Sequence, residues 1–147
     1  MLESLRSSGE KTLFLLQSTP EEKGVHRYEP GKWSLKESLC HVMDVERIFS
    51  YRALRFARHD QTPLHGFDDN NYVLEANANV RNMKELIDEM VNLRKTTIDL
   101  FRSFTPTMLQ REGIASENKL SVLSIGYIIA GHECHHYKIL TEKYLSK

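Results

Sequence analysis

Cysteine, proline and glycine are all scarce in this sequence. Its 147 residues include only 2 cysteines, 4 prolines and 7 glycines. So few glycines and prolines exclude a collagen-like or low-complexity chain. The two cysteines, Cys40 and Cys134, lie far apart and show no disulfide-framework spacing, which is typical of a protein in a reducing compartment. We therefore expect a cytoplasmic location.

A surplus of charge of either sign is absent as well. Twenty basic residues balance twenty acidic ones, so the formal net charge is zero, and nucleic acid is not an expected partner. No apolar run approaches the roughly 20 residues that span a bilayer. Glu3, with no basic region before an apolar stretch, argues against a signal peptide. We expect no membrane partner.

What is present is the composition of a globular protein, with 40% hydrophobic and 27% charged residues. A chain of this length predicts a single domain over residues 1–147. No internal repeat or low-complexity tract divides it. The domain is therefore expected to bury one continuous core.

The apolar residues recur with a helical period along nearly the whole chain. Four stretches carry this pattern: Leu2, Leu5, Leu13 and Leu16; Leu35, Leu39, Val42, Phe49 and Phe56; Met83, Leu86, Met90, Arg94, Ile98 and Phe101; and Val122, Ile125, Ile129 and Leu140. Ser34 and Glu37 form a capping-box pattern, and the helix that they begin is predicted to run to about Arg58. Four amphipathic helices predict an all-α four-helix bundle with no sheet of more than two strands.

The connections between these stretches are long. They take roughly 15, 20 and 16 residues, whereas bundles commonly use about two to eight. Long connections indicate either a functional loop or short elements that the pattern does not reveal. We interpret the middle one, His59–Asn70, as a lid across one end of the bundle.

Two histidines interrupt the apolar stripe of the last helix. At about 100° per residue, His136 lies about 40° from His132 on the helical wheel, on the same face as Ile125 and Ile129. Burying two imidazoles is unfavourable unless each finds a partner. A shared metal ion satisfies both, because residues four apart project side by side. The pair therefore predicts a metal site.

His41, on the second helix, is the candidate for a third ligand. It borders the inward face, early in its helix, whereas His132 and His136 lie late in theirs. If these two helices run antiparallel, the three imidazoles meet at one end of the bundle. Three nitrogen ligands and a water molecule form the open arrangement that catalytic metals use. For His41 alone, an ordinary hydrogen-bonded core histidine is the competing interpretation.

The identity of the metal stays open at this point. Imidazole ligands suit zinc, nickel, iron, copper and, less well, manganese. We favour zinc or nickel among these divalent metals. Cys40 and Cys134 point away from the ligand face and are not expected to bind it.

Four further residues lie near the predicted ligands, where they would contact those ligands rather than the metal: Glu46, Arg52, Glu133 and His135. Arg52 shares the face of His41, and a salt bridge to another helix is favoured over anion binding. Glu46 is expected either to pair with an arginine or to hold a histidine tautomer. We favour a structural role for both Glu46 and Arg52. His135 is expected to contact the ligands or to lie on the surface.

Residues His132 to His136 also match the His-Glu-x-x-His motif of zinc peptidases, with Glu133 at the general-base position. The motif is short and arises by chance. In its extended form, glycine and histidine would be required where Ile139 and Glu142 stand. Only eleven residues follow His136, which leaves no room for a ligand on a further helix. A peptidase is therefore a minor alternative.

Several segments resemble the DinB-like family: Pro30–Ser34, His41–Asp44, Tyr51–Arg58 and Gly131–His136. The resemblance extends from about Leu2 to Tyr144. It implies a four-helix bundle that holds a divalent metal on His41, His132 and His136, and it implies a homodimer. The residue pattern selects the same three histidines.

For function, the resemblance implies a metal-dependent enzyme that acts on a small molecule. The family that the sequence resembles includes thiol-dependent isomerases, S-transferases using low-molecular-weight thiols, hydrolases and many proteins with no assigned activity, so we expect a transferase or hydrolase of that type. The catalytic residues are not identified by the sequence. The alternative is a non-catalytic metal-binding module of a stress response, since fold does not determine chemistry.

Overall fold

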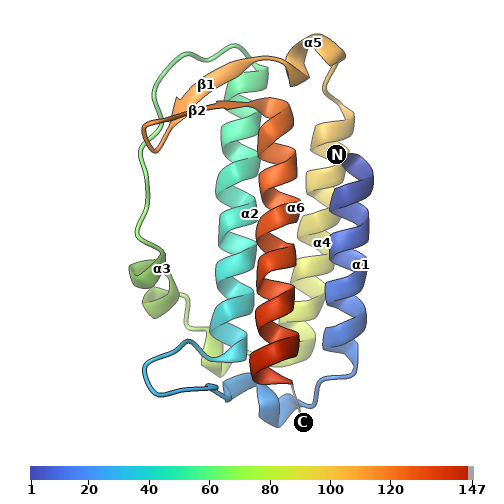
Figure 1. Ribbon diagram of the computed structural model, residues 1–147, viewed down its shortest axis with the longest axis vertical. Coiled ribbons are helices and arrows are strands. Elements are labelled where there is room, and N and C mark those ends of the chain that lie inside the picture. Colours follow the sequence, from blue (N-terminus) through green and yellow to red (C-terminus); the bar gives the residue numbers. More distant parts are fainter. Residues whose placement is uncertain (146–147) are drawn as a thin grey trace.

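The computed structural model describes residues 1–145 and contains the four expected helices (Figure 1). They are α1 (Leu2–Gln17), α2 (Leu35–Ala57), α4 (Met83–Arg102) and α6 (Val122–Ile139). A π-helical segment, η3 (Leu140–Tyr144), continues α6 toward the C-terminus. The prediction of an all-α four-helix bundle is confirmed.

Reciprocal side-chain caps mark where two of these helices begin. At the start of α2, the Glu37 amide donates to Oγ of Ser34 at 3.1 Å, and the Ser34 amide donates to the Glu37 carboxylate at 2.7 Å. This is the predicted capping box, and α2 ends one residue before the predicted Arg58. Ser121 and Ser124 cap α6 in the same reciprocal way. Both helices that carry the candidate ligands therefore begin at defined positions.

The four helices pack as a ring in which α6 lies between α1 and α2, and α4 closes the ring opposite α6. In Figure 1, α1 and α6 run in one direction, and α2 and α4 run in the other. The neighbours α2 and α6 are therefore antiparallel. As a consequence, the beginning of α2 and the end of α6 lie at the same end of the bundle.

Short elements occupy the long connections. The first connection contains η1 (Glu21–Val25), and the second contains α3 (Asp69–Glu75) and η2 (Ala78–Val80). The third contains α5 (Pro106–Leu109) and a hairpin of β1 (Glu112–Ala115) and β2 (Asn118–Ser121). The only sheet within residues 1–145 is this antiparallel pair. The limit of two strands is thus confirmed.

The segment from His59 to Asn70 lies elsewhere than predicted. It runs down the side of α2 toward α3 instead of crossing one end of the bundle (Figure 1). The Leu64 amide donates to the Ile114 carbonyl at 2.9 Å, and the Ser116 amide donates to the Leu64 carbonyl at 2.9 Å. Pairing with the hairpin thus holds the segment against the flank of the bundle, and the prediction of an end-covering lid is wrong.

The core has two apolar halves with a charged layer between them. One half includes Leu16, Leu39, Leu86 and Leu140, and the other includes Leu5, Phe56, Phe101 and Ile125. Arg94 of α4 lies between them with two buried glutamates, one on α2 and one on α6. No helix among residues 1–145 has the length and apolarity needed to cross a membrane.

Candidate metal centre

The antiparallel packing of α2 and α6 brings three histidines together. His41 lies in the second turn of α2, and His132 and His136 lie in the last two turns of α6. One ring nitrogen from each histidine lies within 4.8 Å of the others. Nε2 of His41 is 3.1 Å from Nε2 of His132. The structure thus assembles the three residues that the sequence pattern selects.

Neighbouring polar groups orient two of the rings. Oγ of Ser38 lies 3.2 Å from Nδ1 of His136, within hydrogen-bond distance. When Nδ1 donates this bond, the lone pair of Nε2 is free to bind a metal. Oδ1 of Asp69 lies 3.8 Å from Nδ1 of His41, so a carboxylate faces the nitrogen that is not directed at His132. Nε2 of His41 faces His132, and for His136 the contact with Ser38 leaves Nε2 as the nitrogen that can bind a metal.

Burial keeps the imidazoles uncharged at neutral pH. His41 and His136 are buried and His132 is partly exposed. Desolvation, followed by the neighbouring histidines, lowers the pKa of His132 to about 4 and that of His136 to about 3. Desolvation also lowers the pKa of His41, although Asp69 opposes that shift. Because only neutral imidazole binds a metal, the cluster is in its ligating form at pH 7.

The donor set fits a divalent transition metal. It consists of three neutral nitrogens, and within residues 1–145 no cysteine or carboxylate joins the cluster. Cys40 is buried in the apolar core and Cys134 is exposed. Three imidazoles suit zinc, nickel, copper or iron, and they leave coordination positions for exchangeable ligands.

Two pockets flank the histidine cluster. A pocket of about 410 Å³ begins at His41 and His132 and extends along α2 to Arg52. Phe67 and Asp69, from the segment that runs down the flank, form part of its wall, and the hairpin forms another part. A second pocket, of about 320 Å³, is lined by His136, Ser38 and Trp33. The cluster is therefore accessible from both sides, as an exchangeable-ligand site requires.

The four residues predicted to contact the ligands have separate locations. His135 is exposed, and its ring lies edge-on to that of His136 at 5.3 Å between centroids. Arg52 lines the same pocket as His41 and His132. Glu46 and Glu133 contact Arg94 instead of the histidines. For Glu46, this is the arginine pairing that the sequence analysis offered as one of two roles.

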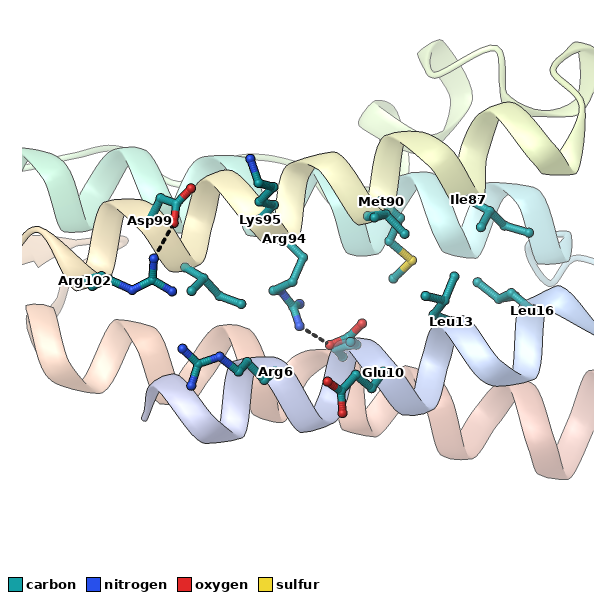
Figure 2. A pocket seen from close by; sticks show the side chains of 14 residues that line it. Arg6, Glu10, Leu13, Leu16, Ile87, Met90, Arg94, Lys95, Asp99 and Arg102 are labelled. Atoms are coloured by element: carbon teal, nitrogen blue, oxygen red, sulfur yellow. Dashed lines mark hydrogen bonds and ion pairs between the residues drawn. The ribbon is translucent and has the colours of Figure 1, made fainter.

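The position of Glu133 bears directly on the peptidase motif. Oε2 of Glu133 accepts a hydrogen bond from Nη1 of Arg94 at 2.7 Å, and the glutamate is almost fully buried. Figure 2 shows Arg94 reaching from α4 into this charged layer, beside the α1 residues Arg6, Glu10 and Leu13. A general base must reach the water that it activates. Glu133 instead forms an ion pair with Arg94, on a different face of α6 from the histidines.

Ser38 and Asp69 were missed by the sequence analysis. Ser38 lies three residues before His41, so helical spacing alone places it near the same face, and this signal was available. Asp69 is the first residue of the short helix α3, and its approach to His41 depends on the path of a long loop. No periodic pattern predicts that approach.

Metal-free protein is expected to lose stability as the pH falls from about 6.5 toward 4. The ordinary pKa of histidine is near 6.5, and the folded values of His132 and His136 lie well below it. In this window the unfolded chain binds protons that the folded chain does not, so acid favours unfolding. Thermal melts of chelator-treated protein at pH 7 and pH 5 measure the effect.

His136→Leu is the matched control for this pH dependence, because it removes the histidine with the lowest pKa. The remaining groups that act on the cluster are His41, His132, His135, Asp69 and Asp44. The melting temperature of the variant should therefore change less between pH 7 and pH 5 than that of the wild type. Equal changes in the two proteins would contradict the assignment of buried, neutral histidines.

The fold and the site define the class of this protein as a four-helix bundle with three clustered histidines at one end, a donor set that could hold a divalent metal. Residues 4–140 match the model of the DinB superfamily. The chain belongs to this superfamily, and the predicted resemblance is confirmed. No curated protein matches the sequence significantly.

Solved structures of similar fold include two informative neighbours. YfiT from Bacillus subtilis, described as a probable metal-dependent hydrolase with an unusual four-helix bundle topology, superposes with a TM-score of 0.83 at 14% identity. That match covers 96% of this chain and 82% of YfiT. The mycothiol-dependent maleylpyruvate isomerase superposes with a TM-score of 0.78 at 13% identity. The match covers 92% of this chain but only 57% of the isomerase. At these identities the likeness establishes the fold alone.

Proposed function

We propose that the protein is a divalent-metal-dependent enzyme that acts on a small molecule, with His41, His132 and His136 as the metal ligands. The observation that carries the proposal is the open three-histidine cluster at the head of a pocket of about 410 Å³. Zinc or nickel is the favoured ion. A purely structural site would be expected to have a closed set of four protein ligands.

The bound ion would supply Lewis acidity, which lowers the pKa of a coordinated water or thiol. The chain's own residues prepare the site for this chemistry. Ser38 and Asp69 orient His136 and His41, and the apolar side chains of Val45, Phe49 and Ile128 line the pocket and limit its water.

The carboxylates near the histidine cluster favour thiol transfer over hydrolysis as the reaction. Hydrolysis is helped by a general base next to the coordinated water. Glu133 is bound to Arg94, and the pocket's one carboxylate within the described residues, Asp69, lies against His41. A coordinated thiol loses its proton without such a base. The thiol-dependent isomerase and the hydrolase of similar fold keep both reaction types in the proposal.

The experiment compares chelator-stripped protein with protein reloaded with zinc or nickel. Each form is assayed for conjugation of low-molecular-weight thiols to an electrophile such as monochlorobimane, and for hydrolysis of a panel of small esters and amides. We expect thiol conjugation that is lost on stripping and restored by metal. Ester hydrolysis with no thiol activity would place the protein with the hydrolases.

The same experiment also tests the alternative of a non-catalytic metal-binding module. Tight metal binding without metal-dependent turnover of any substrate class would favour that alternative. Equal turnover by stripped and loaded protein would overturn the proposal, because the cluster would then have no part in the reaction.

A further inference from the structure

Arg52 is a buried arginine without a carboxylate partner. It lies on α2, it is only 3% exposed, and it forms no ion pair with residues 1–145. Its Nη2 atom donates to the carbonyl of His65 at 3.0 Å and to Oγ of Ser116 at 2.8 Å. Both partners are neutral. The expected salt bridge to another helix is therefore not present for this residue.

Arg94 shows how this fold otherwise treats a buried arginine. Its guanidinium binds Glu46 with two nitrogens and Glu133 with a third hydrogen bond, at 2.7 to 2.9 Å. A buried charge without a counter-charge is costly. Among the buried lysines and arginines of residues 1–145, Arg52 is the one that has no carboxylate partner.

Arg52 lies where its positive charge can contact a molecule in the pocket. It lines the same pocket as His41 and His132, and it lies eleven residues after His41 on α2. At 1.5 Å per residue, the two α-carbons are about 16 Å apart along the helix. The Arg52 guanidinium lies over the ring of Phe49 at 4.9 Å, which directs it back toward His41 by about one turn. An extended small molecule can therefore contact both ends of the pocket.

Two phenylalanines and a serine hold the Arg52 guanidinium in place and leave two of its nitrogens without a hydrogen-bond partner in residues 1–145. Phe49 and Phe67 lie 4.9 Å and 5.8 Å from its central carbon. Ser116, whose hydroxyl binds Nη2, is the first residue of the two-residue turn between β1 and β2, and its φ of 49° is the left-handed backbone that such turns use. Nε and Nη1 form no hydrogen bond within residues 1–145, and neither is a fully buried unpaired atom. These two nitrogens remain available to a ligand.

The charges along the pocket also differ between its ends. Asp69 lies beside His41 at one end, and Arg52 lies at the other. The wall between them includes the apolar side chains of Val45, Phe49 and Leu120. This distribution suits a molecule that is anionic at the end remote from the histidines and less polar in its middle.

We propose that Arg52 anchors the anionic group of the substrate, a carboxylate or a phosphate, while the reacting group lies at the histidine cluster. The inference rests on the proposed function for the reacting end, but the anion-binding end can be tested without metal. The competing role for Arg52 is structural, because its two hydrogen bonds tie the flank segment and the hairpin to α2.

The first arm of the test uses metal-free protein and alkyl probes of equal length. Hexanoate, hexylphosphonate and hexanol are titrated into the wild type and into Arg52→Met and Arg52→Lys. Because a charge-assisted hydrogen bond is about twice as strong as a neutral one, we expect the wild type to bind at least one of the anions about 10-fold more tightly than hexanol. Arg52→Met should lose this preference, and Arg52→Lys should keep part of it. The preferred anion distinguishes a carboxylate from a phosphate group.

Ser116→Ala is the matched structural control. It removes one of the two hydrogen bonds that Arg52 makes to the surrounding chain but keeps the positive charge. If Arg52 is an anchor, Ser116→Ala should keep the preference for the anion. A wild type that binds hexanol as well as both anions would overturn the inference. An anion preference that survives in Arg52→Met would also overturn it, because the anion would then be bound elsewhere.

The second arm uses nickel-loaded protein and mercaptohexanoate against mercaptohexanol. The thiol of each probe should bind at the histidine end of the pocket. The wild type should therefore bind mercaptohexanoate more tightly than mercaptohexanol, and Arg52→Met should bind the two equally. The affinity for nickel should be equal in both proteins. If thiols do not bind the loaded protein while the first arm succeeds, thiol transfer fails and the anchor stands. If the first arm fails while thiols bind, the anchor fails and the proposed function stands.

Discussion

Replacing His136 with leucine is expected to weaken metal binding by at least about 100-fold, since losing residues that merely orient a ligand already costs about 10- to 100-fold. Two imidazoles and water would remain where three imidazoles converge within 4.8 Å. Calorimetric titration of zinc or nickel into chelator-treated wild type and variant measures the loss.

The same substitution should leave the bundle as stable as before, or more so. His136 is 8% exposed and lies on the face of α6 that packs toward α2. Without metal, Ser38 is the one hydrogen-bond partner of this buried imidazole within residues 1–145. Leucine requires no such partner at an apolar position. A thermal melt beside the titration therefore separates a loss of ligand from a loss of fold.

His135→Leu is the control for this experiment. It is the adjacent residue, it is exposed, and it is not part of the three-histidine cluster. Metal affinity in this variant should stay within about 3-fold of the wild type. Normal metal binding by His136→Leu would exclude the proposed triad and leave His136 as an ordinary core histidine. A variant that neither binds metal nor folds would make the site structural and weaken the enzyme proposal.

The helices and the three histidines could be predicted because both depend on local spacing. The intervals of three and four residues that identify α2 and α6 also place His132 and His136 on one face. The capping box of Ser34 and Glu37 marks the start of α2 without any knowledge of the fold. Only the antiparallel pairing of α2 with α6 had to be assumed.

Partners that come from distant segments could not be predicted in this way. Arg94 lies in an apolar stripe of the sequence, and an arginine was one of the two partners expected for Glu46. No local pattern pairs the two residues, because they are 48 residues apart. Arg52 was expected to have a carboxylate partner, yet it contacts a loop carbonyl and a serine in a hairpin turn. The homodimer concerns surfaces between chains, so it stays a prediction.

Arg94→Met is expected to destabilise the protein by about 3–5 kcal/mol, the usual cost of breaking a buried ion pair from one side. The substitution leaves Glu46 and Glu133 buried between the two halves of the core with no counter-charge. It also removes the donor to the Leu5 carbonyl, which Nη1 of Arg94 reaches at 2.6 Å. Since domains have only about 5–15 kcal/mol of stability, urea unfolding should show a large fall in the midpoint.

Arg102→Met provides the matched surface control. Arg102 also lies on α4 and pairs with Asp99 at 2.8 Å, but both side chains are about half exposed. Exposed pairs contribute about 0–1 kcal/mol, so this variant should unfold close to the wild-type midpoint. If Arg94→Met and Arg102→Met unfold alike, the charged layer does not hold the helices together.

Replacing all three charges at once should restore most of the stability. The triple variant Arg94→Met, Glu46→Leu and Glu133→Leu leaves no charge in the layer between the two halves of the core, and such replacements range from neutral to stabilising by about 1–4 kcal/mol. It also removes Oε1 of Glu133, a buried oxygen with no hydrogen-bond partner in residues 1–145. The triple variant should keep metal affinity and metal-dependent activity, because the layer lies apart from the histidines. Loss of activity with metal affinity intact would instead give Glu133 the role that the peptidase motif assigns to it.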